Sequence, residues 1–265
     1  MRRIASFLLG LVALAAQPVL AQTVGQAYAQ PVVVYQEVIE EEIVVPDTGS
    51  ERFVQTPARS ADFVHAEPAD IPRGIARFGP FRVLDGQRAA LVDVTDERSA
   101  VQFAAMLKAY PGLRTLEMIE CPGTEDDRAN LRIGRMIRAQ GMTTHVPRGG
   151  SVRSGAVELF LAGAKRVADA GSEFAVHSWS DNLGLEPDDY AADAPENRVY
   201  VTYYREMGMT EQEARAFYAM TNSVPHADAL WLSSADMGRW VRLDTLRPVA
   251  PLVAELTLDS GAALN

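Results

Sequence analysis

Two residues of the chain, Ser154 and His177, have the types and the spacing that nucleophilic catalysis needs. Ser154 follows a glycine-rich stretch at the predicted start of a helix, where free backbone amides and the helix dipole stabilise negative charge. His177 closes a predicted strand, and the carboxyl ends of strands are where α/β proteins place ligands and catalytic groups. An adjacent imidazole base turns the weak serine hydroxyl into a useful nucleophile.

Each of the two residues also has an ordinary structural interpretation. Serine is a favoured helix N-cap, because its oxygen accepts a free backbone amide of the first turn. A histidine at the end of a strand can be a surface or hydrogen-bonded side chain. One helix, one turn and one strand separate the two residues, which is a path that can bring both to one edge of a sheet.

The segments around this pair alternate between short apolar runs and helical periodicity. This alternation predicts a mainly parallel sheet with helices packed against it. Strands are predicted at 89–94, 113–119, 142–146 and 173–177, and helices after Asp96, after Asp126 or Asp127, and over 154–164. Thr210 with Glu213 predicts a capping box, and residues 233–239 predict another short helix.

Residues 154–165 (SGAVELFLAGAK) and 172–177 (SEFAVH) resemble the nucleophile helix and histidine strand of the Clp protease proteolytic subunit. They resemble still more its exported, periplasmic bacterial relatives in the Clp protease/crotonase superfamily. Residues 116–124 (LEMIECPGT) resemble that family's strand followed by Ser-Pro-Gly-Gly, and the resemblance covers roughly residues 89–180. It implies an α/β fold of repeated β-β-α units with a mainly parallel sheet, flanking helices and a homo-oligomeric assembly.

The resemblance also implies roles for individual residues. Ser154 is the expected nucleophile and His177 the expected general base. The Gly123–Thr124 turn and Gly155 are the expected oxyanion hole, through the backbone amides of Thr124 and Gly155. Thr124 departs from the family, which has a second glycine at this position of the turn.

The expected third member of the site is Asp228, just before the Leu230-to-Ser233 segment, and Asp181 is the alternative nearer in sequence. A lysine base is disfavoured, because Lys108 and Lys165 are the only lysines. Lys108 is expected on the first helix, and Lys165 is expected at the end of the helix that Ser154 begins, roughly 16 Å away. The four scattered histidines form no metal-binding pattern, and no cofactor motif is recognised.

Composition limits the remaining possibilities. The chain has 265 residues, a formal net charge of −10 and a pI near 4.9, which argues against nucleic-acid binding. Residues 1–21 are expected to be a signal peptide, which predicts a periplasmic or secreted protein with no membrane span after cleavage. An acidic, flexible linker is expected over 22–70, an α/β domain over 71–247 and a tail over 248–265. Cys121 is the only cysteine, so no intramolecular disulfide can form.

The leading hypothesis is therefore an exported serine hydrolase that acts on peptides, as a peptidase, or on another acyl substrate, without a cofactor. The alternative is a catalytically inactive scaffold or binding protein of the cell envelope with the same fold. In that alternative, residues 32–45 are expected to form an interaction strand.

Overall fold

The predicted alternation of strands and helices produces repeated β-β-α units in the computed structural model, which describes residues 63–245. The first unit is β4 (Thr115–Met118), β5 (Glu120–Cys121) and α2 (Asp127–Ala139). The second is β6 (Thr143–Val146), β7 (Ser151–Arg153) and α3 (Ala156–Leu161). The strand pair is repeated once more by β8 (Lys165–Ala168) and β9 (Glu173–Val176).

The two strands of each unit belong to different sheets. First strands join a six-stranded sheet in the order β1-β2-β3-β4-β6-β8, where β1 is Ala76–Phe78, β2 is Phe81–Val83 and β3 is Arg88–Leu91. Second strands join a four-stranded sheet in the order β10-β9-β7-β5, where β10 is Leu230–Ser233. The pairs β3–β4–β6–β8 and β5–β7–β9 are parallel, whereas the outer strands β1, β2 and β10 pair antiparallel. The predicted α/β fold of β-β-α units with a mainly parallel sheet is thus confirmed.

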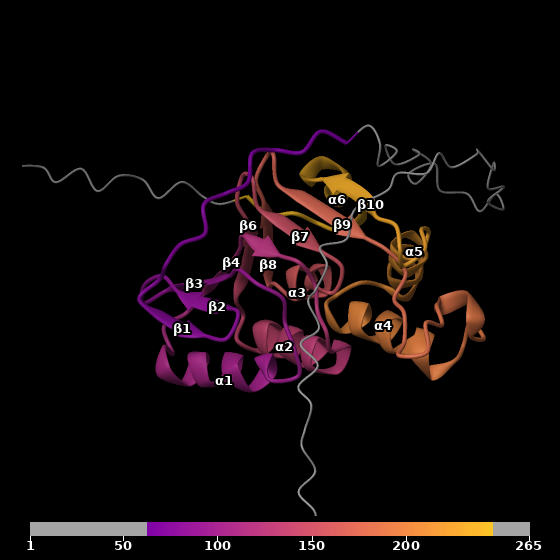
Figure 1. The fold of residues 1–265 in the computed structure, drawn as a ribbon, viewed down its shortest axis with the longest axis horizontal. Coiled ribbons are helices and arrows are strands. Elements are labelled where there is room, and N and C mark those ends of the chain that lie inside the picture. The colour runs from indigo at the N-terminus through magenta and orange to yellow at the C-terminus, as the bar shows by residue number, and fades with distance from the viewer. Residues whose placement is uncertain (1–62, 246–265) are drawn as a thin grey trace, which may run out of the picture. The chain divides into compact units, whose positions relative to one another are not determined.

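Helices cover the strands in two groups. Helix α1 (Ser99–Ala109) packs against α2, and α2 packs against α3. Helix α4 (Pro195–Glu206) packs against α5 (Glu211–Thr221). Figure 1 shows this pair to the right of α2 and α3, with α5 on the side of β9 and β10. The chain also forms a short 3-10 helix, η2 (Pro187–Asp189), and α6 (Ser234–Trp240).

Local signals in the sequence set several helix ends. Asp126 is the N-cap of α2 and accepts a 2.7 Å hydrogen bond from the amide of Ala129. Thr210 and Glu213 form the predicted capping box at the start of α5, and Ser233 forms another with Asp236 at the start of α6. The helix predicted over 233–239 is therefore confirmed with a shift of one residue.

Three strands and one helix differ from the sequence prediction. The helix predicted over 154–164 covers only Ala156–Leu161, because the chain turns at Ser154 and leaves the helix before Lys165 to form β8. Strands β7 and β8 (SVR and KRVA) are too short and too polar for a periodic signal. They form because they pair with parallel neighbours, β7 with β5 and β9 on its two sides and the edge strand β8 with β6. The predicted strand 89–94 ends at Leu91.

Part of the stretch expected to be a linker lies within the described residues, and it contacts the sheets. The ring of Phe63 stacks on Trp231 at 5.7 Å, and His65 meets the same ring edge-on at 4.5 Å. The amide of Ala69 donates a 2.9 Å hydrogen bond to the carbonyl oxygen of Gly149. The expected signal peptide, the rest of the linker, residues 32–45 and the tail from 248 lie outside the described residues. Between residues 63 and 245, no helix is long and apolar enough to cross a membrane.

Candidate active site

Ser154 and His177 line one cavity of about 140 Å³. The cavity lies where the loop after β5, the turn between β7 and α3, and the loop after β9 meet the inner faces of α4 and α5. Its walls therefore come from segments far apart in the sequence. The lining residues are Thr124, Glu125, Asp127, Ser154, Gly155, Glu158, Val176, His177, Trp179, Ser180, Tyr200, Tyr204, Tyr218, Thr221, Asn222 and His226.

Ser154 occupies a strained turn between β7 and α3. Its φ is +49°, and no other non-glycine residue in the described part of the chain has a positive φ. The turn is held on both sides, because the Ser154 amide donates to the Ala175 carbonyl at 2.8 Å and the Ser154 carbonyl accepts from the Val157 amide at 2.9 Å. Gly155, not Ser154, is the N-cap of α3, and no side chain caps this helix. The capping interpretation of Ser154 is therefore wrong, and strained non-glycine residues cluster at functional sites.

The Gly123–Thr124 turn approaches the nucleophile closely. Gly123 has a φ of +133°, and a Cβ placed on it would lie 3.0 Å from the Ser154 Cβ and 3.4 Å from its Oγ. Thr124 adopts a negative φ, so the family's second glycine is not required here for backbone freedom. Its methyl group packs against Gly155, where an added Cβ would lie 2.5 Å from the Thr124 Cγ2.

Within the described part of the chain, the two amides expected to form the oxyanion hole have no hydrogen-bond acceptor. Among residues 63–245, neither the Thr124 amide nor the Gly155 amide donates a hydrogen bond to a carbonyl or side chain, whereas the amides of the neighbours Glu125 and Ser154 do. Free backbone donors beside a nucleophile are what a developing oxyanion requires.

Asn130 ties the two turns together. Its side-chain amide donates to the carbonyl oxygen of Gly155, and its Oδ1 accepts a 3.1 Å hydrogen bond from the Thr95 hydroxyl. The Thr95 amide in turn donates to the Gly123 carbonyl at 3.1 Å. Asn130 is 1% exposed, so these hydrogen bonds form away from bulk water and fix the nucleophile turn against the oxyanion turn.

His177 is oriented by a backbone carbonyl. Its Nδ1 lies 2.8 Å from the carbonyl oxygen of Ser178, so in the neutral ring Nδ1–H donates and Nε2 keeps the basic lone pair. Burial lowers the pKa of His177, an effect that the Ser178 hydrogen bond opposes only in part and that His226 adds to. The imidazole is therefore mainly a neutral base at neutral pH. No hydrogen bond joins the Ser154 Oγ to His177 in the described structure.

Ser178 is itself held in place. Its amide and its hydroxyl both donate to the Val224 carbonyl at 2.9 Å. The Nδ1 of His226 lies 2.9 Å from the same Ser178 carbonyl that His177 uses, and the two imidazole rings meet edge-on at 4.6 Å. The segment before β10 therefore fixes the carbonyl that orients His177.

The structure places the expected acidic members elsewhere. Asp228 is exposed in the turn before β10, where its amide donates to the Pro225 carbonyl, and it does not line the cavity. Asp181 accepts hydrogen bonds from the amides of Leu183 and Leu185 and from Tyr190, which closes a local turn. In this arrangement the Ser178 carbonyl occupies the position expected for a carboxylate.

Three carboxylates that the sequence does not predict as site residues line the cavity, those of Glu125, Asp127 and Glu158. Glu158 accepts a 2.7 Å hydrogen bond from Tyr204, and Asp127 accepts one of 2.7 Å from Tyr200. Burial raises the pKa of Glu158 to about 7, an effect that Tyr204 opposes and the nearby Asp127 adds to. The sequence signal for Glu158 is its position four residues after Ser154, because in the helix predicted over 154–164 this spacing puts both residues on one face.

Aromatic rings form the opposite wall of the cavity. Trp179 stacks on Tyr200 at 6.1 Å, and Tyr200 stacks on Tyr218 at 6.1 Å. The Trp179 indole N–H donates to the Tyr218 hydroxyl at 2.7 Å, and that hydroxyl donates to the Asn197 Oδ1 at 2.6 Å. Cavity walls with this composition combine apolar surface, negative charge and π faces.

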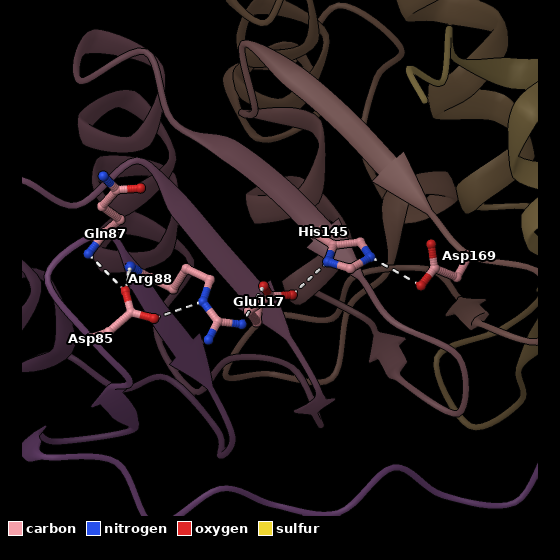
Figure 2. A network of polar contacts seen from close by, with 6 residues as sticks. All are labelled: Asp85, Gln87, Arg88, Glu117, His145 and Asp169. Carbon is pink, nitrogen blue, oxygen red and sulfur yellow. Dashed lines mark hydrogen bonds and ion pairs between the residues drawn. The ribbon is translucent and has the colours of Figure 1, made fainter. Parts of the chain in front are cut away.

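A second polar cluster crosses the six-stranded sheet, and Figure 2 shows it running from strand to strand. His145 lies between Glu117, whose Oε2 is 2.5 Å from Nδ1, and Asp169, whose Oδ2 is 3.1 Å from Nε2. Arg88 lies on the far side of Glu117 and pairs with Asp85 at 2.8 Å. None of these residues lines the Ser154 cavity. Within residues 63–245, no group of three or more His, Cys, Asp or Glu side chains is arranged to hold a metal ion.

Cys121, the other potential nucleophile, is fully buried in β5. Burial, together with the charge of Glu120, raises the pKa of its thiol well above the ordinary value. A buried thiol that stays protonated is a poor nucleophile.

Comparisons with known proteins give similarity of fold only. No protein-family model and no curated protein matches the sequence. Among solved structures, a ClpP1 mutant from Listeria monocytogenes is 16% identical with a TM-score of 0.44, over 59% of this chain and 88% of that one. A membrane-bound stomatin-specific protease in complex with a substrate peptide is 15% identical with a TM-score of 0.37, over 56% and 70%. An enoyl-CoA hydratase from Shewanella pealeana is 14% identical with a TM-score of 0.40, over 62% and 66%.

Proposed function

We propose that this chain is an exported serine hydrolase of the Clp protease/crotonase superfamily that cleaves peptides. The observation that carries the proposal is the strained turn that presents Ser154 to a cavity shared with His177 and with two free backbone amides. Strain of this kind persists only where the surrounding structure enforces it, and here hydrogen bonds to Ala175, Val157 and Asn130 do so. Export is supported by the expected signal peptide at residues 1–21.

The proposed reaction is acyl transfer. The Ser154 Oγ attacks the substrate carbonyl carbon while its proton passes to the Nε2 of His177. The amides of Thr124 and Gly155 stabilise the oxyanion. The imidazolium then gives the proton to the leaving amine as the C–N bond breaks. Water, deprotonated by His177, hydrolyses the acyl-enzyme and returns the proton to Ser154.

In this mechanism the Ser178 carbonyl holds neutral His177 in the tautomer that carries its proton on Nδ1. A carbonyl accepts the Nδ1–H as a carboxylate would, but it carries no full charge and stabilises the imidazolium less. The serine–histidine pair is therefore a dyad oriented by backbone, and Asp228 contributes only if its turn moves toward the imidazole on substrate binding.

The test is covalent labelling of the full chain with a fluorophosphonate probe, followed by mass spectrometry of the labelled peptide. The probe is expected to modify Ser154, and His177→Ala is expected to slow modification by roughly 100-fold or more. Ser154→Ala is the matched control. Labelling that persists in Ser154→Ala, or its absence from the wild-type chain, would overturn the proposal.

One observation favours the alternative of an inactive scaffold. The Ser154 Oγ and His177 share a cavity but form no hydrogen bond in the described structure. Catalytic hydrogen bonds are often long before substrate binds, so the same geometry also fits a resting enzyme. The labelling experiment separates the two, because a scaffold is not modified at Ser154.

A further inference from the structure

The cavity beside Ser154 carries negative charge without a matching cation. Its lining includes the carboxylates of Glu125, Asp127 and Glu158 and, among the described residues that form it, no lysine or arginine. Glu158 is the most notable of the three, because it is only 8% exposed. Among the ion pairs of residues 63–245, none involves Glu158 or Asp127. Buried carboxylates are normally paired with a cation, whereas the carboxylate of Glu158 has the Tyr204 hydroxyl as a hydrogen-bond donor and no cation among the described residues.

Two of the three carboxylates, those of buried Glu158 and exposed Asp127, accept hydrogen bonds from one face of α4. Tyr200 and Tyr204 are one helical turn apart, and their hydroxyls donate to Asp127 and Glu158. Each tyrosine can donate only one hydrogen bond, so each carboxylate keeps acceptor capacity for a further donor. The neutral tyrosines orient the negative groups without neutralising them.

The aromatic rings of the cavity favour a ligand that carries a positive charge, as the carboxylates do. The stacked Trp179, Tyr200 and Tyr218 offer apolar surface along which an aliphatic stem can lie, and their π faces attract a cation. A dry cavity of about 150 Å³ can hold a benzene molecule, so a volume near 140 Å³ suits one side chain rather than a long acyl chain.

We propose that this cavity binds a basic side chain of the substrate, lysine or arginine, and that Glu158 and Asp127 select it. The inference rests on the proposed hydrolase function. Because Ser154 lines the same cavity, the bound side chain would lie beside the bond that Ser154 cleaves. The ammonium or guanidinium group supplies the counter-charge that Glu158 lacks, with its stem against the aromatic wall. The acidic lining rejects aspartate and glutamate side chains by repulsion.

The test uses two phosphonate probes that differ in one charge. A peptidyl diphenyl phosphonate with a lysine side chain is compared with the same probe carrying norleucine, which has similar shape and no charge. In both, the Ser154 Oγ bonds to phosphorus, phenoxide leaves, and the serine proton passes through His177 to give phenol. We expect the lysine probe to modify Ser154 at least about tenfold faster than the norleucine probe.

Substitutions then locate the source of the preference. Glu158→Gln keeps the size of the side chain and an acceptor for Tyr204, and it is expected to reduce the preference to about twofold or less. Asp127→Asn, at the exposed start of α2, is expected to reduce it in part. Glu97→Gln, an exposed carboxylate outside the cavity, is the control and is expected to keep the wild-type ratio.

A binding arm on the Ser154→Ala chain separates this inference from the proposed chemistry. Benzylammonium is expected to raise the thermal unfolding temperature, and neutral benzyl alcohol is expected not to. Modification of Ser154 without a lysine preference, or a preference that survives Glu158→Gln, overturns the inference while the hydrolase proposal stands. If neither phosphonate probe reacts but benzylammonium binds, the cation-site inference stands and the hydrolase proposal is overturned. If neither probe reacts and benzylammonium does not bind, the inference and the hydrolase proposal are both overturned.

Discussion

The hydroxyl of Tyr204 donates a 2.7 Å hydrogen bond to the Oε1 of Glu158, and both residues are buried. This contact joins α4 to the helix that follows Ser154. It leaves Glu158 with a hydrogen bond but no cation, which is an arrangement that costs folding stability when the carboxylate is charged.

Glu158→Gln is expected to raise the free energy of unfolding of the protein without substrate, and the increase is expected to grow as pH rises. Burial raises the pKa of Glu158 from 4.5 to about 7, so the folded state disfavours the charged form. The wild type therefore loses stability as pH rises from the unfolded pKa through the folded one, by up to about 3 kcal/mol. Glutamine does not titrate. Urea unfolding at about pH 5 and about pH 8 measures the difference, which we expect to grow with pH.

The titratable groups around Glu158 are Tyr200, Tyr203 and Tyr204 from α4 and Asp127 from α2. Asp127→Asn controls for the second carboxylate. A Glu158→Gln chain that is less stable than the wild type at both pH values would contradict this account. The gain in stability is expected to accompany the loss of lysine preference, as is common where function requires an unfavourable buried group.

Ser154→Gly is expected to be more stable than Ser154→Ala. Both remove the hydroxyl, but alanine keeps the Cβ that makes a φ of +49° unfavourable, and glycine adopts this conformation freely. We expect a difference of about 1 kcal/mol in the free energy of unfolding, measured by urea denaturation. Equal stability of the two variants would show that the turn is not strained.

Gly123→Ala is expected to abolish labelling of Ser154. The added methyl group would lie 3.0 Å from the Ser154 Cβ, and alanine disfavours the φ of +133° found here. The nucleophile turn must therefore move away from the amide of Thr124. Comparison with Gly141→Ala, at a position that also has a positive φ but has nothing within 4 Å of the added Cβ, separates backbone strain from the clash. Undiminished labelling of Gly123→Ala would refute a close turn.

The sequence allowed the fold and the meeting of Ser154 with His177 at one cavity to be anticipated, because both depend on local periodicity and spacing. Asp126, Thr210 and Ser233 capped helices as their types predict. The charge of the cavity was not foreseen. The burial of Glu158 depends on Tyr204, 46 residues later, and no local pattern fixes how α4 packs.

The orientation of His177 also escaped sequence reasoning. The resemblance implies a carboxylate for this role, whereas in the structure the carbonyl of the next residue, Ser178, accepts the hydrogen bond from Nδ1. Every residue has a carbonyl, so residue type carries no information about this role. Only the hydrogen bonds between Ser178 and Val224 show why this carbonyl is fixed.

The polar cluster around His145, shown in Figure 2, is expected to affect the stability of the protein rather than catalysis. Burial by itself lowers the pKa of His145, but the hydrogen bonds and charges of Glu117 and Asp169 outweigh it, and the net pKa is raised. A base with a raised folded pKa stabilises the protein below its unfolded pKa, and this contribution is lost as pH rises through the folded pKa. His145→Gln is therefore expected to be more destabilising at about pH 6 than at about pH 9.

Urea unfolding of His145→Gln and the wild type at both pH values tests this prediction. Glu158 titrates over part of the same range, but it is present in both chains and cancels in their difference. Glu117→Gln is the matched variant, because it removes the nearer carboxylate and leaves Asp169 facing the imidazole. It is expected to show the same sign of pH dependence. A His145→Gln effect that does not change with pH would mean that the imidazole is neutral between its two carboxylates.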